Sequence, residues 1–358
     1  MADRFLVLWI MFAGILLSQD FTKREETAGA FFSSEGMEII ASSDRITVNH
    51  PSTGKVTQSI KGVKKFIQSP SGAYLVILSF DFQPGKSDYP VSLFLVSRSS
   101  GLIYNKTLTA PFDLPHPLFA VDDNGVVYSF EPLSLTLTAD RIGNISEISI
   151  VEDAEFQMER TFFLKAGNGS VIGAVNLLGR DDSGDNILLF AYDFSTKSLK
   201  SKRLRGSTIS GMEIADGEIL LTTTRESESG VFQESRLLNN SFTESMLPAE
   251  PVSYLLTSEL FLTRQGVIRG RDGSVIASPV LSQVKTITGV YTLPGGKKLL
   301  SAVTNEGNQF FIYHTATGDI RRSEGITAGK NSRPELFISS GMLFVVEDYV
   351  KTTIYQIN

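Results

Sequence analysis

A short pattern recurs along this chain about every 44 residues. Each copy follows an apolar run and contains a polar residue, a small Ser/Thr pair, usually Gly, and then a residue with high β-strand propensity. The clearest copies are residues 50–56, 97–103, 193–199 and 314–320, and the weaker ones are 140–145, 236–242 and 271–275. A period of this length is typical of stacked supersecondary units such as the blades of a β-propeller.

A second series of turns, rich in Gly and Asn, alternates with the first. Its members are residues 69–72, 122–125, 166–169, 215–217, 257–259, 293–296 and 338–341. Gly and Asn adopt the positive φ of tight hairpin turns, so both series indicate joints between strands. Seven members in each series predict an all-β propeller with seven four-stranded blades. Six or eight blades stay open, because residues 37–41 and 352–357 are spare strand candidates, and the alternative fold is a two-sheet β-sandwich.

The runs between the turns have the character of blade strands. Residues 74–78 and 342–346 are almost unbroken apolar segments, as expected for strands covered on both faces. Residues 55–60 are more polar and alternate, as expected for an outer strand. The last blade, beginning at 335–347, lacks an outer hairpin, and we expect residues 44–60 to complete it by pairing N- and C-terminal strands.

The N-terminus has a segment of a different kind. Residues 5–17 form an apolar run that as a helix would span only about 20 Å, too short for the hydrocarbon core of a membrane. We therefore interpret residues 1–19 as a signal peptide or an N-terminal anchor, residues 20–35 as a linker and residues 36–358 as one propeller domain. A small-x-small cleavage pattern occurs only downstream, at residues 28–30. The expected localisation is secreted or extracytoplasmic.

Composition excludes several classes of function. The net charge is −6 with no basic stripe, so we expect no nucleic-acid partner. The chain has no Cys, which removes disulfides, thiolate nucleophiles and Cys-based zinc sites, and only three His. Its single Trp is Trp9, within the leader, which departs from the Trp-containing propeller repeats. We expect no cofactor, no membrane contact beyond the leader, and a monomer.

Two turns carry a resemblance to a known family. Thr53-Gly54-Lys55-Val56 and the segment from Ser69-Pro70-Ser71-Gly72 to residue 76 resemble the repeat of YVTN-type and quinoprotein-like seven-bladed propellers, which carry Thr-Gly-Lys-Val and Ser-Pro-Asp-Gly turns. The match is good over residues 44–80, fair over 308–320 and faint elsewhere. The resemblance implies the fold and little about function, because propellers include enzymes, adhesins and scaffolds.

The loops give the best sequence indication of a site. With strands A to D in each blade, the A–B and C–D turns lie at one end and the B–C and D–A loops at the other. The second set is longer and irregular, and comprises residues 81–90, 109–117, 151–159, 177–186, 225–230 and 325–334. Variable loops on a rigid scaffold are where binding sites are usually built. The candidate binding residues on this face are Asp81, Asp88, Tyr89, Asp113, His116, Arg180, Lys330 and Arg333.

Two groups of residues have competing interpretations. His50 and His314 occupy the same place in their repeat turns, which indicates a turn role, and His116 lacks that explanation. Asp181, Asp182 and Asp185 could hold Ca²⁺, which takes oxygen ligands, or could form a solvated polar turn.

Two function classes follow. The favoured one is an exported, non-catalytic propeller that acts as a binding or scaffold module for a protein or glycan partner on the B–C/D–A loop face. The alternative is a propeller enzyme, a lyase or hydrolase with a polar site at the channel mouth. The expected inner strands, such as residues 64–68 and 118–121, share no acidic position, so we favour the first class and leave catalysis open.

Overall fold

The structure is a computed structural model of the 358-residue chain. It describes residues 20–61, 64–81, 88–111, 119–131, 134–150, 157–167, 169–178, 186–205, 208–215, 217–227, 230–245, 247 and 251–358. The chain divides into two compact units, a larger one spanning Phe32–Ala277 and a smaller one that joins residues 20–31 to Ser278–Asn358. The residues of the expected leader, 1–19, lie outside the described part.

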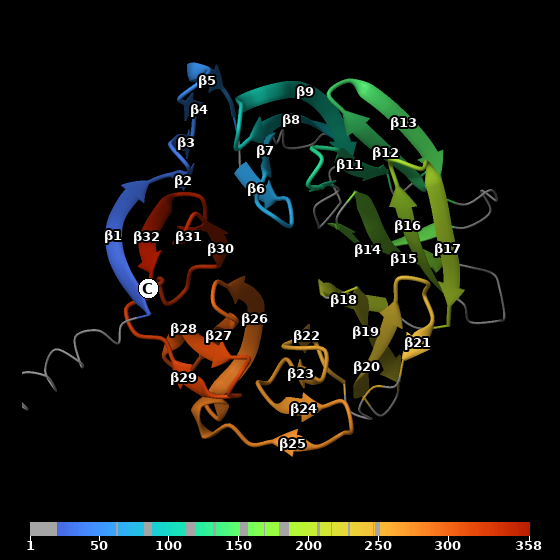
Figure 1. The fold of residues 1–358 in the computed structure, drawn as a ribbon. Helices are drawn as coiled ribbons and strands as arrows, with labels where there is room; N and C mark the ends of the chain where they lie inside the picture. The colour runs from blue at the N-terminus through green and yellow to red at the C-terminus, as the bar shows by residue number, and fades with distance from the viewer. Residues whose placement is uncertain are drawn as a thin grey trace, which may run out of the picture. The chain divides into compact units, whose positions relative to one another are not determined.

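Six four-stranded antiparallel sheets are built from consecutive strands of the first part of the chain (Figure 1). The first three are β2 (Ala30–Ser34), β3 (Met37–Ala41), β4 (Arg45–His50) and β5 (Gly54–Ser59); β6 (Lys64–Gln68), β7 (Tyr74–Phe80), β8 (Asp88–Ser97) and β9 (Gly101–Pro111); and β10 (Phe119–Val121), β11 (Val127–Glu131), β12 (Thr136–Arg141) and β13 (Asn144–Ser149). The next three are β14 (Gln157–Ala166), β15 (Ser170–Leu178), β16 (Ile187–Asp193) and β17 (Ser198–Leu204); β18 (Thr208–Ala215), β19 (Glu218–Ser227), β20 (Gly230–Asn239) and β21 (Glu244–Ser245); and β22 (Tyr254–Leu255), β23 (Leu260–Leu262), β24 (Ile268–Gly270) and β25 (Val275–Ile276).

The smaller unit contains two more sheets. One consists of β26 (Val284–Leu293), β27 (Lys297–Thr304), β28 (Gly307–His314) and β29 (Ile320–Arg322), preceded by the single-turn helix η1 (Pro279–Leu281). The other has the order β1-β32-β31-β30, from β1 (Phe21–Ala28), β30 (Pro334–Ser339), β31 (Met342–Glu347) and β32 (Lys351–Ile357). The described residues therefore form eight four-stranded blades of a β-propeller.

The predicted count of seven blades is wrong. Residues 44–60 do not complete the last blade, because β4 and β5 form a separate blade with β2 and β3. The outer strand of the last blade is β1, which pairs antiparallel with β32 from Phe21↔Ile357 to Ala28↔Lys351. An N-terminal strand thus does pair with a C-terminal one, but it is a different strand from the one expected.

The error has a physical cause in residues 20–35, for which the sequence indicated a linker. These residues form β1 and the whole of β2. Strand β1 has the sequence FTKREETA and lies at a sheet edge with most of its side chains in solvent, so it carries charges where a central strand would carry apolar residues. Only Phe21, fully buried, marks it as part of the core.

The repeat pattern itself is explained by turn capping. At the C–D turn after β16, Asp193 Oδ1 accepts hydrogen bonds from the backbone N–H groups of Ser195 and Thr196 at 2.8 and 3.0 Å. In the turn after β4, His50 Nδ1 accepts from the N–H of Ser52 at 3.1 Å, which confirms the predicted turn role of this histidine. The polar residue that opens the repeat therefore satisfies turn backbone groups that would otherwise lack partners.

Candidate functional site

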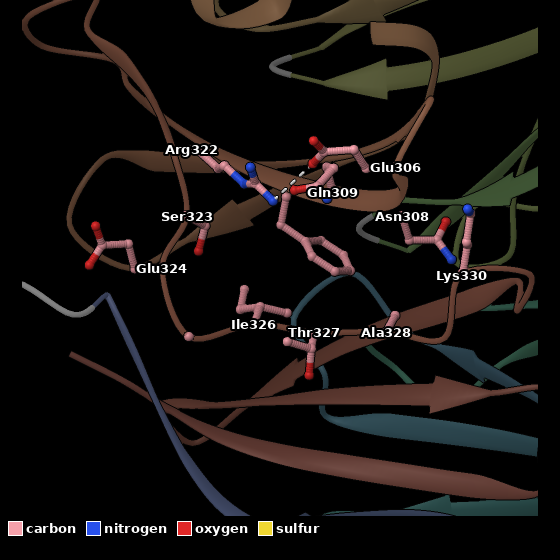
Figure 2. Close-up of a pocket in the computed structure, with 12 residues that line it drawn as sticks. Glu306, Asn308, Gln309, Arg322, Ser323, Glu324, Ile326, Thr327, Ala328 and Lys330 are labelled. Carbon is pink, nitrogen blue, oxygen red and sulfur yellow. Dashed lines mark ion pairs between the residues drawn. The ribbon is translucent and has the colours of Figure 1, made fainter. Parts of the chain in front are cut away.

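A pocket of about 600 Å³ lies in the smaller unit, at the B–C and D–A end of the sheet β26–β29 (Figure 2). Its lining comes from the short turn between β27 and β28, from the first residues of β28, from the end of β29, and from the D–A connection to β30. We call this connection, residues 323–333, the pocket segment. One part of the lining, the pocket segment, therefore belongs to the D–A loops that the sequence analysis selected for binding.

The pocket opens where the pairing of β28 with β29 ends. The register of the two strands runs from Tyr313↔Ile320 to Phe311↔Arg322, and one more bond follows, from Ser323 N–H to the Phe310 carbonyl at 2.8 Å. Gly325 then adopts φ +94°, in the left-handed region that favours glycine. A Cβ at this position would lie 2.4 Å from the Phe21 carbonyl oxygen, so glycine also allows the pocket segment to pass close to β1.

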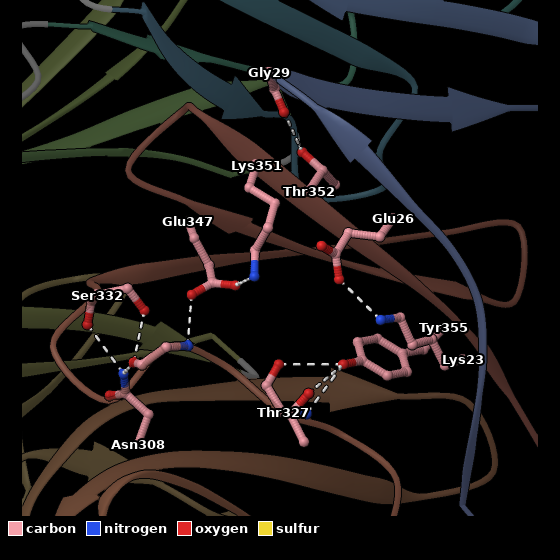
Figure 3. A network of polar contacts seen from close by, with 11 residues as sticks. Lys23, Glu26, Gly29, Asn308, Thr327, Ser332, Glu347, Lys351, Thr352 and Tyr355 are labelled. Carbon is pink, nitrogen blue, oxygen red and sulfur yellow. Dashed lines mark hydrogen bonds and ion pairs between the residues drawn. The ribbon is translucent and has the colours of Figure 1, made fainter.

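Tyr355 of β32 fixes the middle of the pocket segment. Its side chain is fully buried, and its hydroxyl accepts from the Thr327 N–H at 3.0 Å and donates to the Thr327 carbonyl at 3.1 Å (Figure 3). One phenol therefore satisfies both backbone groups of a residue that belongs to no strand. Such pairing is needed because an unmade hydrogen bond in a partly buried segment destabilises the fold.

Glu347 at the end of β31 fixes the next turn of the segment. Its carboxylate is 5% exposed, accepts from the Gly329 N–H at 2.5 Å and forms an ion pair with Lys351 at 2.8 Å (Figure 3). Burial acts to raise the pKa of Glu347, but the hydrogen bonds from Lys351, the Gly329 backbone and Ser332 outweigh it, and the pKa lies below its ordinary value. The charged form thus holds the segment.

Asn308 joins the pocket segment to β28. Its Nδ2 donates to the carbonyls of Gly329 and Ser332 at 2.7 and 3.0 Å. At the neighbouring Gly307, a Cβ would lie 2.7 Å from Lys330 Cγ, so the stem of Lys330 packs directly against the backbone of the strand. The pocket wall is held by side chains from three strands, which makes it a pre-formed surface.

The lining combines a small apolar floor with charged groups around it. Phe310 and Ile326 are 2% and 7% exposed and contribute the floor with Ala328. Arg322 and Glu306 form a loose ion pair at 3.6 Å, with both side chains mostly in solvent. Ser323 is 8% exposed, and its hydroxyl has no hydrogen-bond partner among the described residues. Such a lining can hold a ligand by polar contacts and shape.

The structure places one predicted site residue in this pocket. Lys330 lines it, and Arg333 lies at the end of the same segment. Asp81 and Tyr89 lie in the larger unit, at the B–C end of strands β7 and β8. There the Asp81 N–H donates to the Pro90 carbonyl at 3.0 Å, and the Tyr89 ring packs edge-on against Phe80.

The remaining predicted residues lie outside what the structure describes. The backbone of Asp88 begins β8, but its side chain is not among the described ones. Asp113, His116 and Arg180, and the calcium candidates Asp181, Asp182 and Asp185, lie outside the described residues. These assignments stay predictions. Among the described residues, no group of three or more His, Asp or Glu side chains is placed to hold a metal ion.

Sequence reasoning missed seven lining residues: Glu306, Asn308, Gln309, Phe310, Arg322, Ser323 and Glu324. Phe310 and Arg322 belong to strands, and Glu306 to a two-residue turn, so none of the three stands in a long irregular loop. The available signal was the pocket segment itself, whose larger part, residues 325–333, was among the selected loops. Because the lining residues come from two separated stretches of chain, residues 306–310 and 322–330, only their placement in the fold identifies them as neighbours.

Comparisons with known proteins support the fold. A scan against protein-family models and a search of curated proteins found no match. Among solved structures, the chain is similar to one described as the Dos1 propeller, with 11% identity, coverage of 94% of this chain and 96% of that chain, and a TM-score of 0.58. It is also similar to a structure described as a eukaryotic initiation factor, with 12% identity, coverage of 91% and 83%, and a TM-score of 0.53. At these identities the likeness shows the β-propeller fold alone.

The described part of the chain includes no helix with the length and hydropathy of a transmembrane span.

Proposed function

We propose that this protein is a non-catalytic binding module and that the pocket at residues 306–330 receives part of a protein partner. The observation that carries the proposal is the fixed geometry of the pocket segment, which Tyr355, Glu347 and Asn308 hold in place. A surface that is already ordered loses little conformational entropy on binding, so it is suited to recognition. β-Propellers commonly serve as scaffolds for protein binding, which agrees with this function.

The charged groups of the pocket favour binding over a lyase or hydrolase activity. A general acid or base must lie within hydrogen-bond reach of the reacting group, in a site from which water is excluded. Glu306 is instead 63% exposed and faces Arg322, and Glu324 is also an exposed side chain. Exposed carboxylates of this kind suit contacts with a partner's polar side chains.

A site-specific photo-crosslinker tests the proposal. The photoreactive residue replaces Gln309 in the pocket or, as the matched control, Ala316 in the exposed C–D turn at the other end of the same sheet. We expect irradiation in the cells that make the protein to yield one discrete adduct from position 309, identified by mass spectrometry, and none from position 316. Equal adducts from both positions, or none from position 309, would count against the pocket as the contact.

We further propose that residues 1–19 direct export and that the protein acts outside the cytoplasm, as a YVTN-type or quinoprotein-like propeller. Asp20 is 5% exposed, and its carbonyl accepts from the Asn358 N–H at 2.9 Å, so the packed structure already includes the residue after the leader. Cleavage at residues 28–30 would remove β1, whereas cleavage at or before Asp20 leaves every described strand. N-terminal sequencing of the exported protein tests whether cleavage occurs at or before Asp20. A mature chain that begins after residue 28 would show that β1 is removed and would contradict the assignment of residues 1–19 as the export segment.

A further inference from the structure

We propose that the pocket recognises an extended peptide segment that carries one acidic and one basic side chain on either side of a small apolar side chain. This inference rests on the proposed function and names the chemistry of the bound part. Three features of the pocket carry it: two unpaired charges of opposite sign, an apolar floor between them, and a buried hydroxyl.

The first feature is the pair of charged side chains without an ion-pair partner. Lys330 and Glu324 are both exposed lining residues, and no described residue forms an ion pair with either of them. The other two charged lining residues, Glu306 and Arg322, already face each other at 3.6 Å. A ligand with a carboxylate near Lys330 and a cationic group near Glu324 would therefore complete the charge pairing of the pocket.

The two charges are separated and held in place. Figure 2 shows Lys330 beside Asn308 at one side of the pocket and Glu324 at the other, with Ile326 and Ala328 between them. Lys330 is positioned because its stem packs against Gly307. The apolar floor between the charges is small, since Phe310 and Ile326 are almost fully covered by the protein. It therefore suits a small apolar side chain and offers no broad aromatic face for a sugar ring to stack on.

The buried hydroxyl favours a peptide backbone. Ser323 is only 8% exposed, yet its Oγ has no hydrogen-bond partner among the described residues. A buried hydroxyl without a partner is costly, and a ligand N–H or C=O group would remove that cost. Strand pairing along β28 also ends beside this residue, at Phe311↔Arg322. An extended segment can lie there and present its backbone to Ser323 and its side chains to the two charges and the floor.

The experiment uses a positional-scanning library of fluorescent hexapeptides with acetylated N-termini and amidated C-termini, screened against the full chain. We expect the wild type to select Asp or Glu at one position and Lys or Arg at another, with a small apolar residue between them. Lys330→Glu is expected to abolish the acidic preference and weaken the best wild-type peptide about tenfold. Ser323→Ala is expected to weaken it about threefold without changing the charge preferences.

The matched control is Lys285→Glu, which changes the net charge by the same amount at an exposed position outside the pocket. It is expected to leave selection and affinity unchanged. Circular dichroism and the melting temperature check that each variant is folded. Absence of charge selection in the wild type, or the same selection in Lys330→Glu, overturns the inference. If position 309 still crosslinks a partner in that case, only the ligand chemistry is wrong; if it does not, the proposed function fails as well.

Discussion

The C–D turn after β16 and the pocket segment show two ways of fixing an irregular backbone. In the turn, Asp193 caps N–H groups two and three residues away. The Ser195 hydroxyl donates to the same carboxylate oxygen, and this bond, together with those from the backbone N–H groups, lowers the pKa of Asp193. In the pocket segment, the backbone partners are Tyr355, Glu347 and Asn308, which are 18 to 28 residues distant in sequence. The turn therefore depends on its own residues, whereas the segment takes its shape only once β28, β31 and β32 have assembled.

This difference bears on function. A turn with local caps can form with any neighbours, and such caps recur in the turns that follow His50 and Asp272. A segment held by distant side chains is specific to one place, and its geometry can be tuned by residues that do not touch a ligand. Substitutions in the pocket segment should therefore destabilise the fold more than substitutions in the turn.

The largest expected difference comes from two glycines with positive φ. Gly325 in the pocket segment has φ +94° and a Cβ position 2.4 Å from the Phe21 carbonyl oxygen, whereas Gly318 in the C–D turn has φ +78° and open space around it. Gly325→Ala should lower the free energy of unfolding by about 3 kcal/mol, from backbone strain plus the clash. Gly318→Ala should lower it by about 1 kcal/mol, from strain alone. Urea unfolding measures both, and equal losses would show that packing around the pocket segment is loose.

Removal of the carboxylate that holds Gly329 should have the next largest effect. Glu347→Ala leaves a partly buried N–H and Lys351 without their partner, and we expect a loss of about 2 kcal/mol. Hydrogen exchange should accelerate at Gly329 while the turn at residues 193–198 stays unchanged. The control is Glu306→Ala, whose exposed ion pair contributes less than about 0.5 kcal/mol. Unchanged exchange at Gly329 would contradict the assigned role of Glu347.

Removal of a local cap should have a smaller and confined effect. Asp193→Ala deletes the acceptor for two turn N–H groups that can still reach water, so we expect a loss of about 1 kcal/mol. Asp193→Asn keeps an acceptor oxygen and should retain most of the stability. Exchange in the pocket segment should not change in either variant. Faster exchange at residues 323–333 would show that the turn and the pocket segment are coupled.

The smallest expected effect is the contribution of Glu347 to the pH dependence of stability. The folded state lowers the pKa of Glu347 below its ordinary 4.5, so the carboxylate contributes stability that is fully present above the unfolded pKa and is lost as the pH falls through the folded pKa. Between about pH 6 and about pH 4 only part of this contribution disappears, and we expect less than about 1 kcal/mol. The slope of the free energy of unfolding against pH should be shallower in Glu347→Gln than in the wild type. Identical slopes in both proteins would show that another carboxyl group carries the dependence.

The features that the sequence predicted correctly are those formed by residues close together in the chain. The turn series, the apolar strands and the turn role of His50 follow from residues close together in the chain. Sequence reasoning failed at β1, because an outer strand in solvent has the composition of a linker. It selected Lys330 because this residue lies in an irregular loop, and it passed over Ser323, whose burial without a partner depends on how residues 306–310 and 322–330 come together.

The sequence by itself determined that the chain forms strands joined by capped turns at a regular spacing, since propensity, periodicity and positive φ are properties of neighbouring residues. Only the tertiary structure decided that there are eight blades and that β1 pairs with β32. It also decided that Tyr355, Glu347 and Asn308 meet around one segment. The physical reason is that strand pairing and burial join residues whose separation in the chain leaves no local signature, so the same polar run can be a linker or an edge strand until its partner is present.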